Sequence, residues 1–315
     1  MTYIKKLPLP LAAVILACAA IGNLLATYTY LAKNIFGGIA TVLFILLTIK
    51  IMFCWSDVKE ELKNPVIASV VPTYSMAMMI LSGYLKDFSM DAGLILWWLG
   101  LIIHVWLIIF YTKNFIFKFN IKKVFPSTFI VYVGIAAASI TAPIFGLSNI
   151  GKGIFWFALI SFLILLIVIG YRVVIVKEIP EQAMPTMVIF AAPAALVLAG
   201  YLNSFEQKNI IMVCFLAVFT GILYTIGLIY LLKCLSIKFY PSYAAFTFPM
   251  VIGAIALKGT NNLLINIEKE IKLLKYIVKF QEIIAVLAVV YVIIRFIIFI
   301  FDVSIKKSKM QSMEG

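Results

Sequence analysis

The sequence predicts an all-α integral membrane protein whose ten transmembrane helices form five helical hairpins around a central axis. Hydrophobic residues make up 64% of the 315 residues, against the roughly 45–50% that is usual in soluble domains. The apolar runs are continuous rather than alternating, which favours helices over a β-barrel. Proline occurs in every second run and in none of the runs between, which indicates a repeat of one bent and one straight helix.

Each apolar run is long enough for one membrane-spanning helix, which needs about 20 residues. Because the number of runs is even, both ends of the chain are expected on the same side of the membrane. We interpret residues 1–305 as one ten-helix transmembrane domain and residues 306–315 as a short basic cytoplasmic tail that frays. The runs cover residues 7–32, 35–55, 66–85, 90–112, 125–147, 150–172, 185–204, 209–233, 240–258 and 276–301.

The distribution of positive charge predicts the orientation. Of the 26 Lys and Arg residues, 17 fall on the side of the two termini. Because Lys and Arg gather on the cytoplasmic side of membrane proteins, we expect both termini in the cytoplasm. The same bias accounts for most of the formal net charge of +13.

The odd-numbered runs carry proline followed by glycine, a pattern that predicts bent helices close to a central axis. Proline removes a backbone donor and crowds the preceding turn, and small residues permit close approach of helices. We therefore expect the odd-numbered runs to form an inner ring inside a lipid-facing ring of even-numbered ones. The candidate pore-lining or kink positions, for each of which helix packing is the alternative, are Pro10, Gly22, Pro72, Thr73, Pro126, Gly134, Pro193, Gly200, Pro249 and Gly253.

The ninth run, residues 240–258, contains an F-x-F-P string formed by Phe246, Phe248 and Pro249, and it carries no charge before Lys258. A helix that bends beside an aromatic ring can narrow a pathway at that point. We predict that Phe248 is the pore gate, with Phe246 as its nearest competitor. For either ring, packing against lipid or a neighbouring helix is the alternative.

The expected inner helices hold no Asp, Glu, His, Lys or Arg away from their ends, which favours passive conduction over proton-coupled pumping. His104 is interpreted as a rim residue hydrogen-bonded within the bundle, and Asp91 and Glu282 as residues near the membrane interface. Arg295 is expected to extend toward the cytoplasm. Helix amino termini at the kinks and the excess of Lys and Arg at both faces favour an anion as the permeating ion.

Other functional classes lack support in the sequence. The hydrolase, metalloprotease and phosphate-binding motifs are absent, so we expect no enzyme activity and no cofactor. The four cysteines lie in or beside apolar runs without a C-x-x-C pair, so we expect neither a metal site nor a disulfide framework. Nucleic-acid binding would have no soluble domain to occupy.

The longest connection, residues 261–276, carries apolar residues at helical spacing with charged residues between them. This pattern predicts an amphipathic helix that lies on the outer membrane interface.

Four strings in order resemble the tellurite-resistance and dicarboxylate transporter family, which includes bacterial TehA-type channels and the plant slow-type anion channels. The resemblance covers nearly the whole membrane region. The strings are PLPLAAVILACAAIGNL, LKNPVIASVVPTYSM, APAALVLAGY and SYAAFTFPM.

The resemblance implies ten helices in a quasi-fivefold arrangement, a homotrimer of independently conducting protomers and a pore lined by the odd-numbered helices. It also implies that a phenylalanine of the ninth helix, matched here to Phe248, occludes this pore. The expected function is a gated anion channel or channel-like exporter in the lipid bilayer, with small inorganic or organic anions as its partners. The alternative is a secondary transporter of C4-dicarboxylates, sulfite or tellurite.

Overall fold

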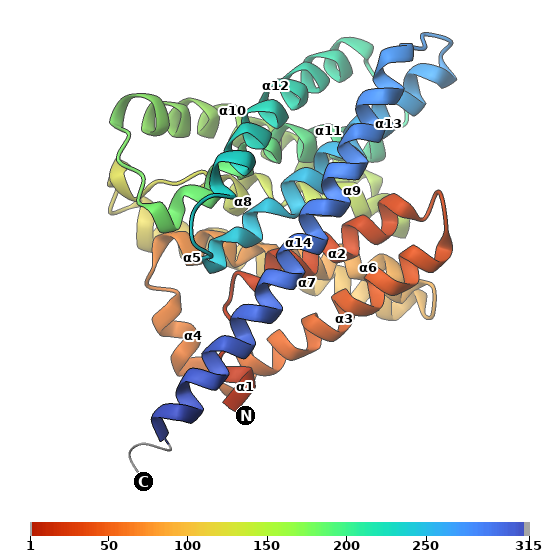
Figure 1. Cartoon of the computed structure of the whole chain (residues 1–315). Helices are drawn as coiled ribbons and strands as arrows, with labels where there is room; N and C mark the ends of the chain where they lie inside the picture. Colours follow the sequence, from red (N-terminus) through yellow and green to blue (C-terminus); the bar gives the residue numbers. More distant parts are fainter. Residues whose placement is uncertain (1, 312–315) are drawn as a thin grey trace.

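The structure is a computed structural model that describes residues 2–311, and side chains for residues 4–301, as helices joined by short connections (Figure 1). Within this range, nine helical segments are long and apolar enough to cross a membrane, and α2 (Leu11–Leu25) is a shorter apolar helix. The chain is therefore a multi-pass membrane protein with ten apolar helical segments. The predicted fold class is confirmed.

The even-numbered segments are the long helices of each hairpin. Because they contain no proline, their backbone ladder continues from end to end. Two of them close with a π-helical turn, η1 (Thr112–Ile116) and η4 (Arg172–Val176). The five helices are α3 (Tyr30–Phe53), α7 (Met90–Tyr111), α10 (Ser148–Tyr171), α12 (Ile210–Cys234) and α14 (Lys272–Gln311).

The odd-numbered segments, by contrast, are interrupted. In three of them the second piece begins with proline at its first or second position, because proline has no N–H to donate to the preceding turn. The break in the fifth segment lies at Gly134 and Ile135 and contains no proline. The pieces are α5 (Pro65–Val70) and α6 (Pro72–Lys86); α8 (Thr128–Val133), α9 (Ala136–Thr141) and η3 (Ala142–Phe145); η5 (Glu181–Ala191) and α11 (Pro193–Ser204); and η6 (Pro241–Phe246) and α13 (Phe248–Asn266).

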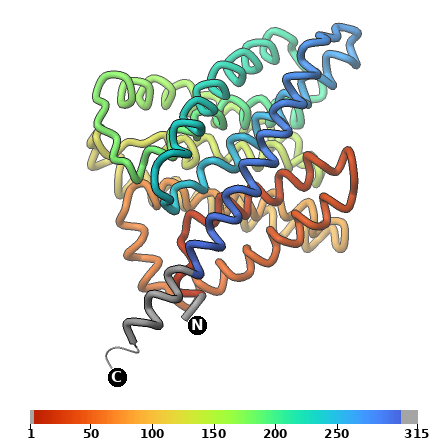
Figure 2. The backbone as a smooth tube through the Cα atoms, in the orientation of Figure 1, coloured from red at the N-terminus to blue at the C-terminus, as the bar shows by residue number. Residues whose placement is uncertain are grey.

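The odd-numbered segments close into a ring in which each helix packs against the next. The contacts run from α2 to α6, α9, α11 and α13, and from α13 back to α2. Each even-numbered helix packs on the outside against the preceding segment of its own hairpin, as the backbone trace shows for α13 and α14 (Figure 2). This is a quasi-fivefold arrangement of hairpins with an inner and an outer ring.

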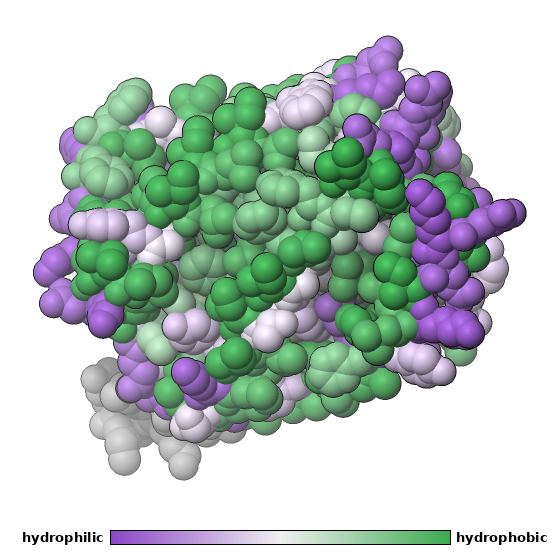
Figure 3. Space-filling view, turned by 90° about the horizontal axis from the view of Figure 1, so that it is seen from above, coloured by the Kyte–Doolittle hydropathy of each residue, from purple (hydrophilic) through white to green (hydrophobic). Residues whose placement is uncertain are grey.

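Burial separates the two rings. In the four longer inner segments, 67–94% of the most apolar stretch is buried, whereas the corresponding value for the outer helices is 22–33%. Viewed from above, the surface shows an apolar band between two polar ends (Figure 3). The band is the part of the surface that suits the hydrocarbon region of a bilayer.

Short helices complete the described chain. Helix α1 (Thr2–Lys5) precedes the first segment, and α4 (Trp55–Glu61) joins α3 to α5. The three-residue turn η2 (Ile121–Lys123) precedes the fifth segment.

The prediction of an interfacial helix over residues 261–276 is wrong. Helix α13 continues to Asn266 and α14 begins at Lys272, so only a short turn separates them. The continuation is stabilised by packing, because Leu264 is buried against the neighbouring helices, and the turn contains Glu268 with a φ of 57°.

Two segment boundaries also differ from the sequence prediction. The first segment is helical only from Leu11 to Leu25, because Pro8 and Pro10 delay its start. Helix α14 runs through residue 305, the predicted domain boundary, as far as Gln311. Residues 312–315 lie outside the described range, and the frayed tail stays a prediction.

Tyr84 packs between helices α2, α3 and α6. Its ring, on α6, fills the space left by Gly22 of α2 and Gly37 of α3, and a Cβ atom at either glycine would overlap it. Its hydroxyl group donates a hydrogen bond of 2.7 Å to the carbonyl oxygen of Ala19. The absence of a side chain at these two glycines is therefore a packing requirement.

We predict that Gly37→Ala lowers the melting temperature of the purified protein in detergent, because overpacking a filled site costs about 1–3 kcal/mol. The matched control is Gly38→Ala, because a Cβ atom at Gly38 meets nothing within 4 Å. Equal melting temperatures for the two variants would contradict this account of the packing.

Candidate functional site

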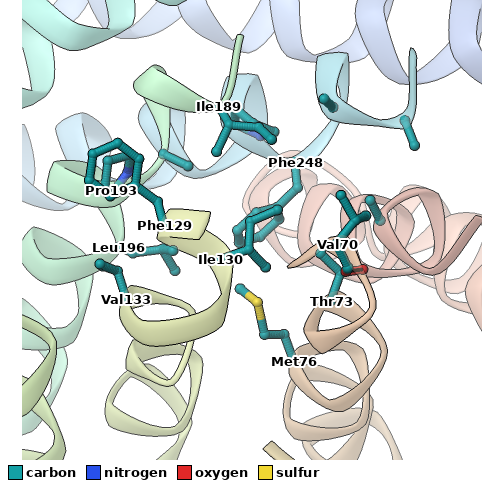
Figure 4. Close-up of a pocket in the computed structure, with 15 residues that line it drawn as sticks. Val70, Thr73, Met76, Phe129, Ile130, Val133, Ile189, Pro193, Leu196 and Phe248 are labelled. Carbon is teal, nitrogen blue, oxygen red and sulfur yellow. Dashed lines mark hydrogen bonds between the residues drawn. The ribbon is translucent and has the colours of Figure 1, made fainter. Parts of the chain in front are cut away.

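A small apolar cavity, here called the central cavity, lies where the odd-numbered segments are interrupted (Figure 4). All five odd-numbered segments contribute to its wall, and no even-numbered helix does. Its volume is about 20 Å³, which is room for about one water molecule. The lining residues are Ala13, Val70, Thr73, Met76, Phe129, Ile130, Val133, Ile189, Ala192, Pro193, Leu196, Ala244, Ala245, Phe248 and Pro249.

The wall of the central cavity is uncharged. Thr73 supplies its only polar side chain, and the Thr73 hydroxyl group is already used in a hydrogen bond of 2.7 Å to the carbonyl oxygen of Val70. The cavity therefore offers no titratable group and no free side-chain donor. An ion inside it would lose its hydration shell without gaining a charged partner.

Phe248 reaches into the central cavity between Ile130 and Val70 (Figure 4). Its position is set by Thr247, which has backbone angles φ −87° and ψ −82° between η6 and α13. The Thr247 hydroxyl group lies 2.7 Å from the carbonyl oxygen of Ala244 and 3.3 Å from that of Ala13. The residue before Phe248 is thus tied to both the first and the ninth segment.

Phe246 lies elsewhere. Its ring is buried and packs on the ring of Tyr243 with a centroid separation of 4.5 Å. It is not among the residues that line the central cavity. The geometry therefore favours Phe248 over its competitor as the residue that fills the axis.

Of the predicted proline and threonine positions, Thr73, Pro193 and Pro249 line the central cavity. Pro72 and Pro126 are buried near the starts of α6 and α8 but are not part of its wall.

The predicted glycines contact neighbouring helices instead of the cavity. Besides Gly22, which meets Tyr84, a Cβ atom at Gly253 would overlap the ring of Tyr224. Gly134 adjoins Met76 and His104, and Gly200 adjoins Ser139. For these four positions the geometry favours the packing alternative.

A second cavity, the vestibule, opens at the amino-terminal ends of the odd-numbered segments. It has a volume of about 390 Å³ and shares Val70 with the central cavity. Its wall combines residues from the starts of all five odd-numbered segments with Glu61. These residues are Pro8, Pro10, Asn64, Pro65, Val66, Ile67, Val70, Phe125, Pro180, Gln182, Ala183, Tyr240, Pro241 and Ser242.

The vestibule was not predicted from the sequence, although a signal for it exists. Pro8, Pro65, Pro180 and Pro241 precede or begin four of the odd-numbered segments, and all four line this cavity. Proline is favoured at the first turn of a helix, so the repeated prolines mark helix starts that meet on one side.

Arg172 shapes a connection that leads to the vestibule. Its buried guanidinium group donates to the carbonyl oxygens of Lys177, Glu178 and Lys122. Lys177 and Glu178 have φ values of 56° and 59°, so this hydrogen bonding holds a conformation that side chains disfavour. The Lys122 ammonium group, 2.9 Å from Glu178, holds the pKa of that exposed carboxyl below its ordinary value.

His104 connects two inner segments. Its Nδ1 atom lies 2.9 Å from the hydroxyl oxygen of Ser75, and its Nε2 atom lies 3.2 Å from the carbonyl oxygen of Val131. The side chain is fully buried between the third and fifth segments. The prediction that His104 is hydrogen-bonded within the bundle is confirmed.

Lys258 and Glu282 form an ion pair at the end of the bundle opposite the vestibule. The Lys258 ammonium group donates to Glu282 at 2.7 Å, and the hydroxyl group of Tyr28 donates to the same carboxylate at 2.7 Å. Glu282 is only 3% exposed, and its interpretation as a residue near the membrane interface stays a prediction. The longer reach of α13 and α14 encloses this carboxylate between helices.

No group of three His, Cys, Asp or Glu residues among the described residues could hold a metal ion. The four cysteines are free, with Cys214 exposed and the other three buried.

The comparison with protein families is decisive for the class of this site. A family model described as "SLAC1: Voltage-dependent anion channel" matches residues 6–302. The chain belongs to this family. Among curated proteins, none matches closely enough to count as a relative.

The match spans all five hairpins and the residues of both cavities. It confirms the resemblance that four short strings had indicated. Members of the SLAC1 family are anion channels or transporters rather than enzymes, so the two cavities belong to a protein that moves anions across a membrane.

Lys50 and Glu61 form a largely buried ion pair beside the vestibule. Lys50 is 1% exposed and Glu61 27% exposed. The Lys50 ammonium group also donates to the carbonyl oxygen of Leu7, and Glu61 accepts from the backbone N–H of Leu9 at 3.2 Å. The pair thus fastens the start of the first segment to α3 and α4.

We predict that Glu61→Ala lowers the melting temperature markedly, because removing one partner of a buried ion pair costs about 3 kcal/mol or more. Glu60→Ala is the control, because Glu60 forms an ion pair with Lys63 in which the two side chains are 73% and 72% exposed, respectively. Exposed ion pairs contribute little to the free energy of unfolding, so the control should have the melting temperature of the wild type. If the two variants melted alike, the buried pair would not hold the first segment in place.

Proposed function

We propose that this SLAC1-family protein is a gated anion channel that conducts small anions passively along the axis of its inner ring. The vestibule is the entrance on the side of the amino-terminal ends of the odd-numbered segments, and Phe248 occludes the path in the central cavity. The observation that carries the proposal is that one ring of broken helices encloses both cavities, with Phe248 in the narrower one.

The size and polarity of the central cavity support a closed gate. A volume of about 20 Å³ holds about one water molecule, so a hydrated anion does not fit while the ring of Phe248 occupies its present position. An apolar constriction also blocks ions by remaining dry. Opening then requires the ring to leave the axis.

The polarity of the vestibule supports anions as the permeating ions. The odd-numbered segments begin at its wall, and the positive ends of helix dipoles at amino termini favour negative charge. The formal net charge of +13 raises the concentration of anions near the protein. The one carboxylate of the vestibule wall, Glu61, is paired with Lys50.

Passive conduction is favoured over coupled transport because no residue of the central cavity can carry a proton. A secondary transporter of C4-dicarboxylates, sulfite or tellurite would need coupling groups along the path. The proposed assembly is a homotrimer of independently conducting protomers. The proposed location is the bacterial plasma membrane. The bias of Lys and Arg supports the placement of both termini in the cytoplasm.

We predict that Phe248→Ala raises the chloride or nitrate current in planar bilayers by about tenfold or more, because it removes both the steric block and the dry constriction. The matched control is Phe145→Ala, a buried phenylalanine of another inner segment that lies outside the cavity wall. Its current should stay near that of the wild type.

The proposal fails if Phe248→Ala leaves the current unchanged or if both variants raise it equally. Liposomes with an anion gradient distinguish a channel from a coupled transporter. Channel flux continues after an ionophore has collapsed the proton and sodium gradients, whereas coupled uptake stops.

A further inference from the structure

Arg295 carries a partly exposed guanidinium group on the outer helix α14. The group lies over three aromatic rings, 5.3 Å from the centroid of Phe239 and 5.9 Å from those of Tyr243 and Tyr291. Among residues 4–301, whose side chains the structure describes, it forms no hydrogen bond and no ion pair. Five N–H donors are thus oriented by the rings but left without an acceptor.

The neighbours of Arg295 on the outer face of α14 are apolar. On α14 its neighbours Ile294 and Ile298 are 50% and 57% exposed, on a face that suits lipid chains. An ionised group without a partner is costly in such a setting, so a membrane Arg requires an anionic partner or access to the headgroup region.

The position along α14 matches the headgroup region next to the vestibule. Phe239 precedes η6, whose first residues Pro241 and Ser242 line the vestibule. Lys238, adjacent to Phe239 in the chain, is exposed and lies with its ammonium group 5.2 Å from the ring centroid of Tyr240. A second positive charge thus flanks the site in the sequence.

We propose that Arg295, held by Phe239, Tyr243 and Tyr291, binds the phosphodiester group of an anionic phospholipid in the leaflet that adjoins the vestibule. The planar guanidinium group matches two phosphate oxygens at once. The aromatic rings restrict its motion, so less conformational entropy is lost on binding. The acyl chains of the lipid lie along the exposed apolar face of α14.

The site is connected to the proposed gate by direct contacts. Tyr243, whose ring centroid lies 5.9 Å from the guanidinium group, packs against Phe246 with a centroid separation of 4.5 Å, and Phe246 precedes Thr247 and Phe248. The bound lipid fixes this aromatic chain in the arrangement in which Phe248 fills the central cavity, and so favours the closed state. This second step rests on the proposed function, whereas lipid binding does not.

Native mass spectrometry of the detergent-solubilised protein with added phosphatidylglycerol or phosphatidylcholine tests the binding step. The wild type should retain phosphatidylglycerol preferentially. Arg295→Gln should bind it about tenfold more weakly, because it loses at least one charge-assisted hydrogen bond. Arg295→Lys should fall between the two, because it keeps the charge but loses the planar fork.

Lys269→Gln, which removes an exposed charge in the turn between α13 and α14, is the control for net charge and should bind as the wild type does. Inorganic phosphate should neither bind measurably nor displace the lipid. Unchanged lipid retention in Arg295→Gln, equal loss in Lys269→Gln or displacement by inorganic phosphate would overturn the proposal. So would a change in oligomeric state that explains the loss.

Bilayer recordings test the second step. The current of the wild type should be larger in pure phosphatidylcholine than in membranes containing phosphatidylglycerol, and Arg295→Gln should remove this difference. If mass spectrometry shows binding while the current ignores lipid composition, the coupling to Phe248 is overturned and the lipid site stands. If Phe248→Ala itself has no effect on the current, the proposed gate fails independently of the lipid site.

Discussion

An interrupted helix inside a membrane leaves backbone N–H and C=O groups that lipid cannot satisfy, and this constraint organises the whole molecule. The odd-numbered segments all have late starts or breaks, so they must be enclosed by protein. Packing α2, α6, α9, α11 and α13 into a closed ring meets this need, and the unbroken helices of the hairpins cover the ring. The burial of the inner segments and the exposure of the outer helices follow from the same division.

The same arrangement places the charged residues away from the axis of the inner ring. The central cavity contains no charged residue, whereas ion pairs with one buried partner lie at the two ends of the bundle. Lys50 and Glu61 fasten the first segment beside the vestibule, and Lys258 and Glu282 join α13 to α14 at the other end. A neutral, narrow centre between charged ends suits a path whose resistance is set by one movable ring rather than by a binding charge.

Much of the fold follows from the sequence, because run length and the alternation of proline are strong local signals. The sequence favoured Phe248 over Phe246 as the gate, and the coordinates separate the two, because Phe248 lines the central cavity and Phe246 does not. The glycines were ambiguous: only the partner side chain, such as Tyr84 or Tyr224, shows that they are packing sites. The prediction for residues 261–276 was wrong because their pattern of apolar and charged residues fits both an interfacial helix and two helix ends joined by a turn.

The claim that Phe248 seals an axial cavity is tested most directly by thiol accessibility. Leu196→Cys places a thiol in the cavity wall, and Leu198→Cys, also buried but outside that wall, is the reference. With Cys214 replaced by serine, a small charged thiol reagent should react with residue 196 slowly in the presence of Phe248 and much faster after Phe248→Ala, while residue 198 stays protected. If the reagent reached residue 196 equally in both backgrounds, or in neither, Phe248 would not be the seal.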